Sequence, residues 1–368
     1  MTKTSYKNEQ LKREFFEHLR GAEGFAPASV SKFAEAISQW QTFTDNEDFG
    51  SFNKTTATSF RDWLKTRETK TVAGKLTLVS QYNYLRRLKR FFTWLSGQPD
   101  YRNKVLKNEI EFLRLSKGDA RIARAGTTRA TPSFDDAKKI IEGIEIKNEI
   151  DRRDRAMISF ALTTGCRIFA IISLRMKNFD KEKRLIHQNP GDGVHTKNSK
   201  TILTTFFPIG WDDPERFFVE WYEYLERKGY GPNDPIFPAT LHDAGSVRYS
   251  KDDVGKAFWN GTDAARKIFE KRCHDAGVRY FHPHSFRHLI VSMMSKTRLT
   301  EEEKRAISLN LGHENIATTF GSYGYGGMSE EDAVRIVQKL KDYQANEGSG
   351  YPLTDAERAI LERLLARR

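Results

Sequence analysis

The sequence predicts a mainly helical protein with one small β-sheet, divided into two domains by a linker. Three observations lead to this fold class. The chain has 368 residues, 38% of them apolar, a length that suits about two domains. Apolar residues recur three and four positions apart through the first 116 residues, as they do in helices. One later stretch, 184–209, alternates and is rich in β-branched residues, as strands are.

Residues 1–116 are expected to form a small helical bundle. The helical spacing marks four segments: 10–19, 30–43, 58–64 and 78–95. The last segment has an apolar stripe of Tyr82, Leu85, Leu88, Phe92 and Leu95. Its opposite face is basic and consists of Arg86, Arg87, Lys89 and Arg90. The aromatic residues of this domain have core spacing, so we interpret them as packing residues (Phe15, Phe16, Trp40, Trp63, Phe91 and Trp94).

Positive charge is concentrated in one part of the chain. Residues 51–129 carry 18 basic and 6 acidic side chains, whereas 130–368 carry 37 and 35. The formal net charge of +12 therefore lies in less than a quarter of the sequence. We expect a surface that faces phosphates, with Arg86, Arg87, Lys89 and Arg90 as candidate DNA contacts; the alternative is an ordinary solvated helix face.

Residues 117–131 mix Gly, Thr and Arg without a sustained period, so we expect a linker there. Ser133 then stands at a helix cap position with Asp136 three residues later, and a second domain is expected from 132. After the alternating stretch, helical patterns resume to the end of the chain. An amphipathic helix is expected over 329–343, and a further one over 353–368.

Several protein classes are disfavoured. No apolar run approaches the roughly 18 to 20 residues of a membrane-spanning helix, and the start of the chain lacks the apolar core of a secretory signal. Cys166 and Cys273 cannot build a disulfide framework. We therefore expect a soluble protein of a reducing, cytoplasmic compartment, associated with the nucleoid if DNA is its partner.

Four segments of the second domain place Arg, Lys, His and Tyr beside Gly or Thr. They are 163–167, 197–201, 282–288 and 311–313, the last followed by Tyr323. Only Glu314 adds a carboxylate, which disfavours chemistry that depends on Mg²⁺. Cations and donors for a phosphate are present, together with a phenol that can act as nucleophile. A zinc site has no recognised ligand spacing among its conceivable ligands, His282, His284, His288 and Cys273.

In this order the motifs resemble those of the tyrosine recombinase (phage integrase) family. That family carries an Arg after Thr-Gly-x, a Lys on a β-hairpin, His-x-x-Arg, Leu-Gly-His and a Tyr. The resemblance implies a helical core-binding domain (1–116), a mixed α/β catalytic domain (132–328), and a clamp of both around duplex DNA. Residues 329–368 would be a helical extension that docks on a neighbouring protomer or on its own domain.

The resemblance assigns Arg167 to the Thr-Gly-x-Arg motif. One departure is Ala170, where the family usually has an acidic residue. Without that carboxylate the Arg167 side chain is held in position less firmly, or another carboxylate takes its place. Lys200 precedes Pro208 by eight residues, the spacing of the family's hairpin Lys, so we favour it over Lys197 as general acid.

The remaining motifs assign His284, Arg287, His313 and the nucleophile. Arg287 and Arg167 would clamp the scissile phosphate, while His284 would bond the phosphate or take the tyrosine proton. Tyr323 follows His313 by ten residues and is the expected nucleophile, with Tyr325 as the reserve.

The resemblance implies a site-specific recombinase that cuts and rejoins DNA through a 3′-phosphotyrosyl intermediate. It would need no cofactor, metal or ATP, and four protomers would act on two sites of a mobile element or chromosome. Two alternatives stay open: a type IB topoisomerase, and a catalytically idle DNA-binding or architectural protein of the same fold.

Overall fold

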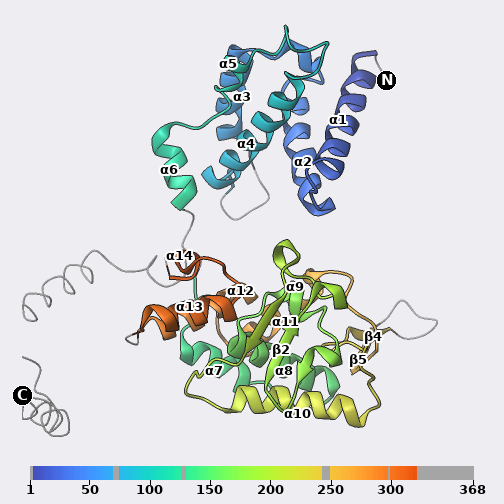
Figure 1. The fold of residues 1–368 in the computed structure, drawn as a ribbon, viewed down its shortest axis with the longest axis vertical. Coiled ribbons are helices and arrows are strands. Elements are labelled where there is room, and N and C mark those ends of the chain that lie inside the picture. The colour runs from blue at the N-terminus through green and yellow to red at the C-terminus, as the bar shows by residue number, and fades with distance from the viewer. Residues whose placement is uncertain (1–2, 69–73, 126–129, 243–248, 297–298, 321–368) are drawn as a thin grey trace, which may run out of the picture. The chain divides into compact units, whose positions relative to one another are not determined.

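The computed structural model describes residues 3–68, 74–125, 130–242, 249–296 and 299–320 (Figure 1). The chain divides into two compact units, Met1–Thr128 and Arg129–Arg368, and each has its own hydrophobic core. Helices predominate in both units, and the strands found in the described ranges all belong to the second. The predicted fold class, mainly helical with a small sheet, is confirmed.

The first unit is a helical bundle. Its elements are α1 (Lys3–Gly21), α2 (Pro27–Phe43), η1 (Phe49–Ser51), α3 (Lys54–Thr66), α4 (Leu78–Leu95), α5 (Lys107–Ile110) and α6 (Lys117–Ala125). Each of the four predicted helices lies within one of them, and α4 has the predicted bounds. The aromatic side chains pack as expected: Phe15, Trp40 and Phe91 are at most 2% exposed.

Helix α6 corrects the predicted linker. The sequence predicts a linker over 117–131, but residues Lys117–Ala125 form a helix and Ala123 is buried in the first core. The side chain of Asp119 accepts a hydrogen bond from Ser116 Oγ (2.8 Å), and Ser116 Oγ in turn accepts one from Asp119 N (3.0 Å). The buried face of α6 consists of small side chains, Ala120 and Ala123, so its apolar period is too weak to predict a helix.

The second unit contains the remaining elements. Its helices are α7 (Phe134–Glu142), α8 (Glu149–Thr164), α9 (Ile168–Ile171), α10 (Asp213–Arg227), α11 (Thr262–Asp275), α12 (Pro283–Met294), α13 (Glu301–Asn310) and α14 (Ile316–Thr319). Its strands are β1 (Phe179–Asp180), β2 (Leu185–Gln188), β3 (Ile202–Thr205), β4 (Thr240–His242) and β5 (Tyr249–Val254). Short 3-10 turns are η2 (Met176–Asn178), η3 (Pro190–Asp192) and η4 (Lys197–Ser199).

Strands β1, β2 and β3 form an antiparallel sheet in that order, with Ile186 opposite both Phe179 and Thr204. This confirms the short sheet predicted within 184–209. Strands β4 and β5 form a second, two-stranded sheet where helical patterns were expected. That prediction was wrong because β5 is mostly exposed and polar, so no apolar alternation marks it.

Helix α8 lies at the centre of the second core, with α10 and α12 packed on it (Figure 1). Helix α7 begins with the predicted capping box, in which Ser133 Oγ accepts from Asp136 N and the Asp136 carboxylate accepts from Ser133 N. Within the described ranges, no helix combines the length and apolarity needed to cross a membrane.

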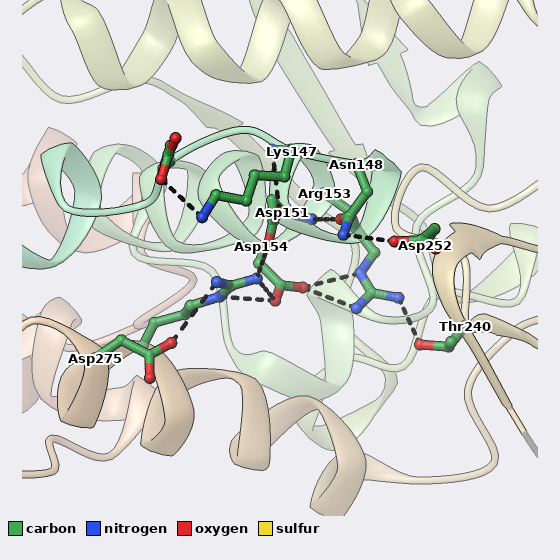
Figure 2. Close-up of polar contacts among 10 residues, drawn as sticks. Lys147, Asn148, Asp151, Arg153, Asp154, Thr240, Asp252 and Asp275 are labelled. Carbon is green, nitrogen blue, oxygen red and sulfur yellow. Dashed lines mark hydrogen bonds and ion pairs between the residues drawn. The ribbon is translucent and has the colours of Figure 1, made fainter.

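A buried ionic network holds the first half of α8 (Figure 2). The carboxylate of Asp154 accepts from Arg153 Nη2 at 2.8 Å and from Arg272 Nη2 of α11 at 2.7 Å. Arg272 also donates to Asp151 at 2.6 Å, and Arg153 donates to Thr240 Oγ1 at 3.1 Å. The network therefore connects α8 to α11 and to β4, and α8 leads directly to the Thr-Gly-x-Arg motif.

Candidate active site

Three of the predicted motifs meet at one side chain, Arg287. Helix α12 begins at Pro283, and His282 caps it by accepting from His284 N through Nδ1 (3.2 Å). One turn later Arg287 is 3% exposed; its Nη1 donates to Gly165 O at 2.7 Å and its Nη2 donates to Leu311 O. The same Nη2 lies 2.7 Å from His313 Nε2. Residues 122 and 26 positions away along the chain are thus held by one guanidinium.

Both motif glycines are required by this packing. Gly165 ends α8 with φ of +63°, and a Cβ there would lie 2.7 Å from Leu311 Cδ2. Gly312 has φ of +68°, and a Cβ there would overlap the side chain of Ile202 in β3. Any larger residue would therefore be strained in its backbone and would push the three motifs apart.

His313 is neutral and has a defined tautomer. An arginine nitrogen can only donate, so His313 Nε2 accepts from Arg287, and the ring proton is assigned to Nδ1, which donates to Thr319 Oγ1 at 2.8 Å. Burial, then the charges of Arg287 and Arg167, lower the pKa of His313 to about 3. The charges of Lys197 and Lys200 also lower the pKa of His313, so both lysines lie near this ring.

His284 and Arg167 lie at the same site. Burial, then the charges of Arg287, His288 and Arg167, lower the pKa of His284 to about 3. Arg167 precedes α9, is half-buried, and forms no hydrogen bond or ion pair with any residue that the structure describes. Ala170 is 1% exposed and belongs to the second core. Among the described residues no carboxylate forms an ion pair with Arg167 in place of the missing acid.

Lys200 follows η4, a tight turn in which Asn198 and Ser199 both have positive φ. Thr196 Oγ1 donates to Lys200 O at 2.6 Å, and the Lys200 ammonium forms an ion pair with Glu314. Since Glu314 adjoins His313, this pair brings the hairpin lysine to the site. Lys197, the alternative, is exposed on the turn.

The end of α13 is joined to β3. The Asn310 side chain accepts from Thr205 N at 2.7 Å and donates to Thr205 O at 3.0 Å, as a neighbouring strand would. Thr204 Oγ1 also donates to Asn310 O at 2.9 Å. These bonds set the position of Leu311 to His313 relative to the hairpin that carries Lys200.

The predicted nucleophile Tyr323 and its reserve Tyr325 lie outside the described residues, as does the predicted helical extension 329–368. The structure therefore gathers five predicted site residues: Arg167, Lys200, His284, Arg287 and His313.

The predicted basic face of α4 is partly neutralised within its own unit. Lys89 forms an ion pair with Glu111 at 2.7 Å, and Arg90 forms one with Glu23. The Tyr84 hydroxyl donates to Glu35 at 2.5 Å; that bond, together with Lys32 and Arg87, lowers the pKa of the Glu35 carboxyl. Arg86 is exposed and has no carboxylate partner among the described residues.

The sequence profile of the phage integrase family matches residues 133–325, more than half of the chain. This chain belongs to the phage integrase family. The match begins at the cap of α7 and includes every motif that meets around Arg287. At the family level the protein is thus a tyrosine recombinase, a class of enzymes that recombine DNA at specific sites.

Curated relatives of this integrase-family chain are tyrosine recombinases. It is 22% identical over 313 residues to tyrosine recombinase XerC of Lactobacillus delbrueckii subsp. bulgaricus, covering 84% of this chain and 92% of the relative. It is 22% identical over 321 residues to XerC of Bacillus pumilus, covering 84% of this chain and 90% of the relative. The alignments extend over both units.

Solved structures share the fold. A lambda integrase dimer bound to a COC′ core site matches with a TM-score of 0.60 and 12% identity, over 87% of this chain and 96% of that one. The Tn1549 transposon integrase in complex with circular intermediate DNA matches with a TM-score of 0.57 and 14% identity, over 89% and 98%. At these identities the likeness concerns the fold.

Sequence reasoning missed two features of the site. One is the role of Glu314 as the partner of Lys200, which only the folded hairpin shows. The other is an aromatic pair beside Arg167, in which the ring of Phe169 stacks on His195 at 4.4 Å between centroids and 15° between planes. Phe169 is 48% exposed, and His195 N donates to Ser173 Oγ at 2.9 Å. No motif marks the pair, because its members are 26 residues apart.

Proposed function

We propose that this integrase-family protein cuts and rejoins duplex DNA at specific sites through a 3′-phosphotyrosyl intermediate. One observation carries the proposal: Arg167, Lys200, His284, Arg287 and His313, predicted from four separate motifs, lie at one site, where the Arg287 guanidinium contacts His313 and the charges of Arg167 and Lys200 act on the His313 ring. Such a gathering of cations and hydrogen-bond donors suits a phosphodiester whose negative charge grows in the transition state.

In the proposed first step, Tyr323 Oη attacks phosphorus and the bond from phosphorus to the 5′ oxygen breaks. His284 is neutral, and it accepts the phenol proton once the negative phosphate offsets the charges of Arg287 and Arg167 that lower its pKa. Lys200 gives a proton to the leaving 5′ oxygen, and Arg167 and Arg287 hold the phosphate oxygens. In the second step a 5′-hydroxyl of the partner strand gives its proton to Lys200 and attacks phosphorus, and the released tyrosine takes its proton back from His284.

The bond energy is kept in the tyrosine ester, so the proposal requires no cofactor. The proposal also includes the two units closing around the duplex and four protomers on two sites, with residues 329–368 docking between protomers, as the family resemblance implies. The structures of lambda and Tn1549 integrases on DNA support duplex DNA as the partner.

The test is the formation of a covalent protein–DNA complex that resists SDS. Nicked suicide duplexes are tiled across the DNA flanking the gene and incubated with wild type, Tyr323→Phe and Tyr325→Phe. We expect an adduct with wild type and Tyr325→Phe, and none with Tyr323→Phe. If Tyr325→Phe alone abolishes the adduct, the nucleophile is Tyr325 and not Tyr323. Relaxation of plasmids without sequence preference would instead indicate a topoisomerase, and binding without any adduct would indicate an idle DNA-binding protein.

A further inference from the structure

A groove in the first unit is lined by cations. It lies beside α4, is closed by the segment 113–117 and α6, and encloses about 620 Å³. We call it the α6 groove. Its apolar part consists of Tyr82, Leu85, Leu113, Leu115 and Ala120, and its charged part of Arg86, Lys89, Arg114, Lys117, Arg121 and Arg124. No acidic residue lines it.

Most of these cations have no carboxylate partner. Lys89 is paired with Glu111. Over the described residues, no carboxylate forms an ion pair with the other five, of which only Arg124 makes a side-chain hydrogen bond, to Ala120 O at 3.1 Å. Four of them belong to the segment 114–124 and are exposed: Arg114, Lys117, Arg121 and Arg124.

A second hollow beside α4 shares Arg86 and Lys89 with the α6 groove and differs in its other charged residues. It encloses about 510 Å³ and is lined by Lys32, Arg87 and Arg90 among others. There Arg90 forms an ion pair with Glu23, and Lys32 Nζ lies 3.3 Å from Glu35 Oε2. Carboxylates of the same unit thus compete with any phosphate on that side, whereas the α6 groove keeps its cations available.

The spacing along α6 matches a nucleic-acid strand. Lys117, Arg121 and Arg124 stand at positions i, i+4 and i+7, which lie on one face of a helix. They span a rise of about 10 Å at 1.5 Å per residue, a length over which one strand of B-DNA presents about three phosphates. Unpaired like charges at this spacing repel one another, so a polyanion that neutralises them is strongly favoured.

We propose that the α6 groove is the main phosphate-binding surface of the first unit and takes the sugar-phosphate backbone of duplex DNA. Arg114, Lys117, Arg121 and Arg124 contact phosphates, and the apolar part of the groove faces deoxyribose. The inference rests on the proposed function only in taking DNA as the partner. It moves the principal contacts from the predicted face of α4 to a segment that the sequence marked as a linker.

The test measures how the affinity for DNA depends on salt. Full-length wild type and the double variant Arg121→Gln/Arg124→Gln bind a fluorescein-labelled 30-base-pair duplex of arbitrary sequence between 50 and 300 mM KCl. Each lost phosphate contact lowers the slope of log K against log salt by about 1, so we expect a fall of about 2. At 100 mM salt the dissociation constant should rise about tenfold.

A matched control removes the same charge elsewhere in the unit. Arg13→Gln/Arg20→Gln changes two exposed arginines of α1, within a segment of net negative charge, and should leave the slope unchanged. If circular dichroism shows a lower melting temperature for Arg121→Gln/Arg124→Gln than for wild type, the salt slope is measured instead with Arg114→Gln/Lys117→Gln. This second variant leaves the middle of α6 intact.

Equal slopes for wild type and a folded groove variant would overturn the inference while leaving the proposed function standing. An equal loss in the α1 control would also overturn it, since the effect would then be net charge alone. Failure of the wild type to bind duplex DNA would contradict the proposed function itself. Groove variants that bind DNA normally but lose binding to polyglutamate would show that the groove takes an acidic polypeptide instead.

Discussion

The ion pair between Lys200 and Glu314 is exposed to solvent, so the Lys200 ammonium can change partners. The Glu314 side chain is 80% exposed, so water competes for the ion pair and a DNA phosphate or 5′ oxygen can displace the carboxylate at low cost. The ammonium is held next to His313 until that exchange, which suits a general acid that must be close to the leaving oxygen.

A substrate with sulfur at the 5′ bridging position tests this role, because a thiolate leaves without a proton. We expect Lys200→Ala to slow cleavage of ordinary DNA by about 10² to 10⁴-fold, the usual contribution of a general acid. Cleavage of the sulfur substrate should stay within a few fold of wild type. Lys197→Ala is the matched control and should cleave both substrates normally. A sulfur substrate that is cleaved as slowly as ordinary DNA by Lys200→Ala would contradict the assignment.

Short motifs in the sequence mark residues that the structure brings together: Arg167 follows Gly165, His313 follows Gly312, and Arg287 completes the His-x-x-Arg motif. Their electrostatic state could not be predicted. The lowered pKa of His313 depends on burial beneath Arg287, a contact across 26 residues that no local pattern encodes. The pairing of Phe169 with His195 is equally non-local.

At the scale of elements, α8 determines where Arg167 lies. Its first half is held by the network around Asp154, in which the Asp154 carboxylate binds two guanidinium groups while 2% exposed. Replacing such a pair with apolar residues is often neutral, but removing one partner leaves an uncompensated buried charge.

We therefore expect Asp154→Asn to lower the free energy of opening of α8 by about 3 to 5 kcal/mol. Hydrogen exchange of the 149–164 amides measures this quantity in the full chain. Asp275→Asn is the control: that carboxylate is 44% exposed and 3.8 Å from Arg272, so its loss should change little. Unaltered protection of α8 in Asp154→Asn would show that the network does not hold this helix.

Elements with a strong apolar period could be predicted, and α4 shows this most clearly. Helix α6 and the β4–β5 sheet could not be predicted, for two different reasons. The buried side chains of α6 are alanines too small to give a pattern, and β5 buries only Val254 fully. In both cases the segment is held by the surface on which it packs rather than by its own composition.

At the scale of the whole molecule, the proposed function assigns most of the DNA binding to the first unit and the chemistry to the second. The excess of positive charge lies within residues 51–129, whereas the second unit is nearly balanced, and the charges of Arg167, Arg287 and Lys200 act together on its His313. If that assignment holds, mutations in the first unit change the salt dependence of the affinity, and mutations in the second unit change the rate of cleavage. The division into a helical first unit and a mixed second unit was predictable from the segment without a period before Ser133 and from the alternation over 184–209; the contacts between motifs were not.

The central claim is that this site forms a bond between a tyrosine and a 3′ phosphate. The most direct measurement is mass spectrometry of the trapped adduct after nuclease and trypsin digestion, which locates the nucleotide on the protein. Cleavage after Arg305 and Arg335 yields one peptide that contains both Tyr323 and Tyr325, and fragmentation distinguishes them. We expect the nucleotide on Tyr323, attached through its 3′ phosphate. A nucleotide attached through a 5′ phosphate, or to a residue other than tyrosine, would contradict the account.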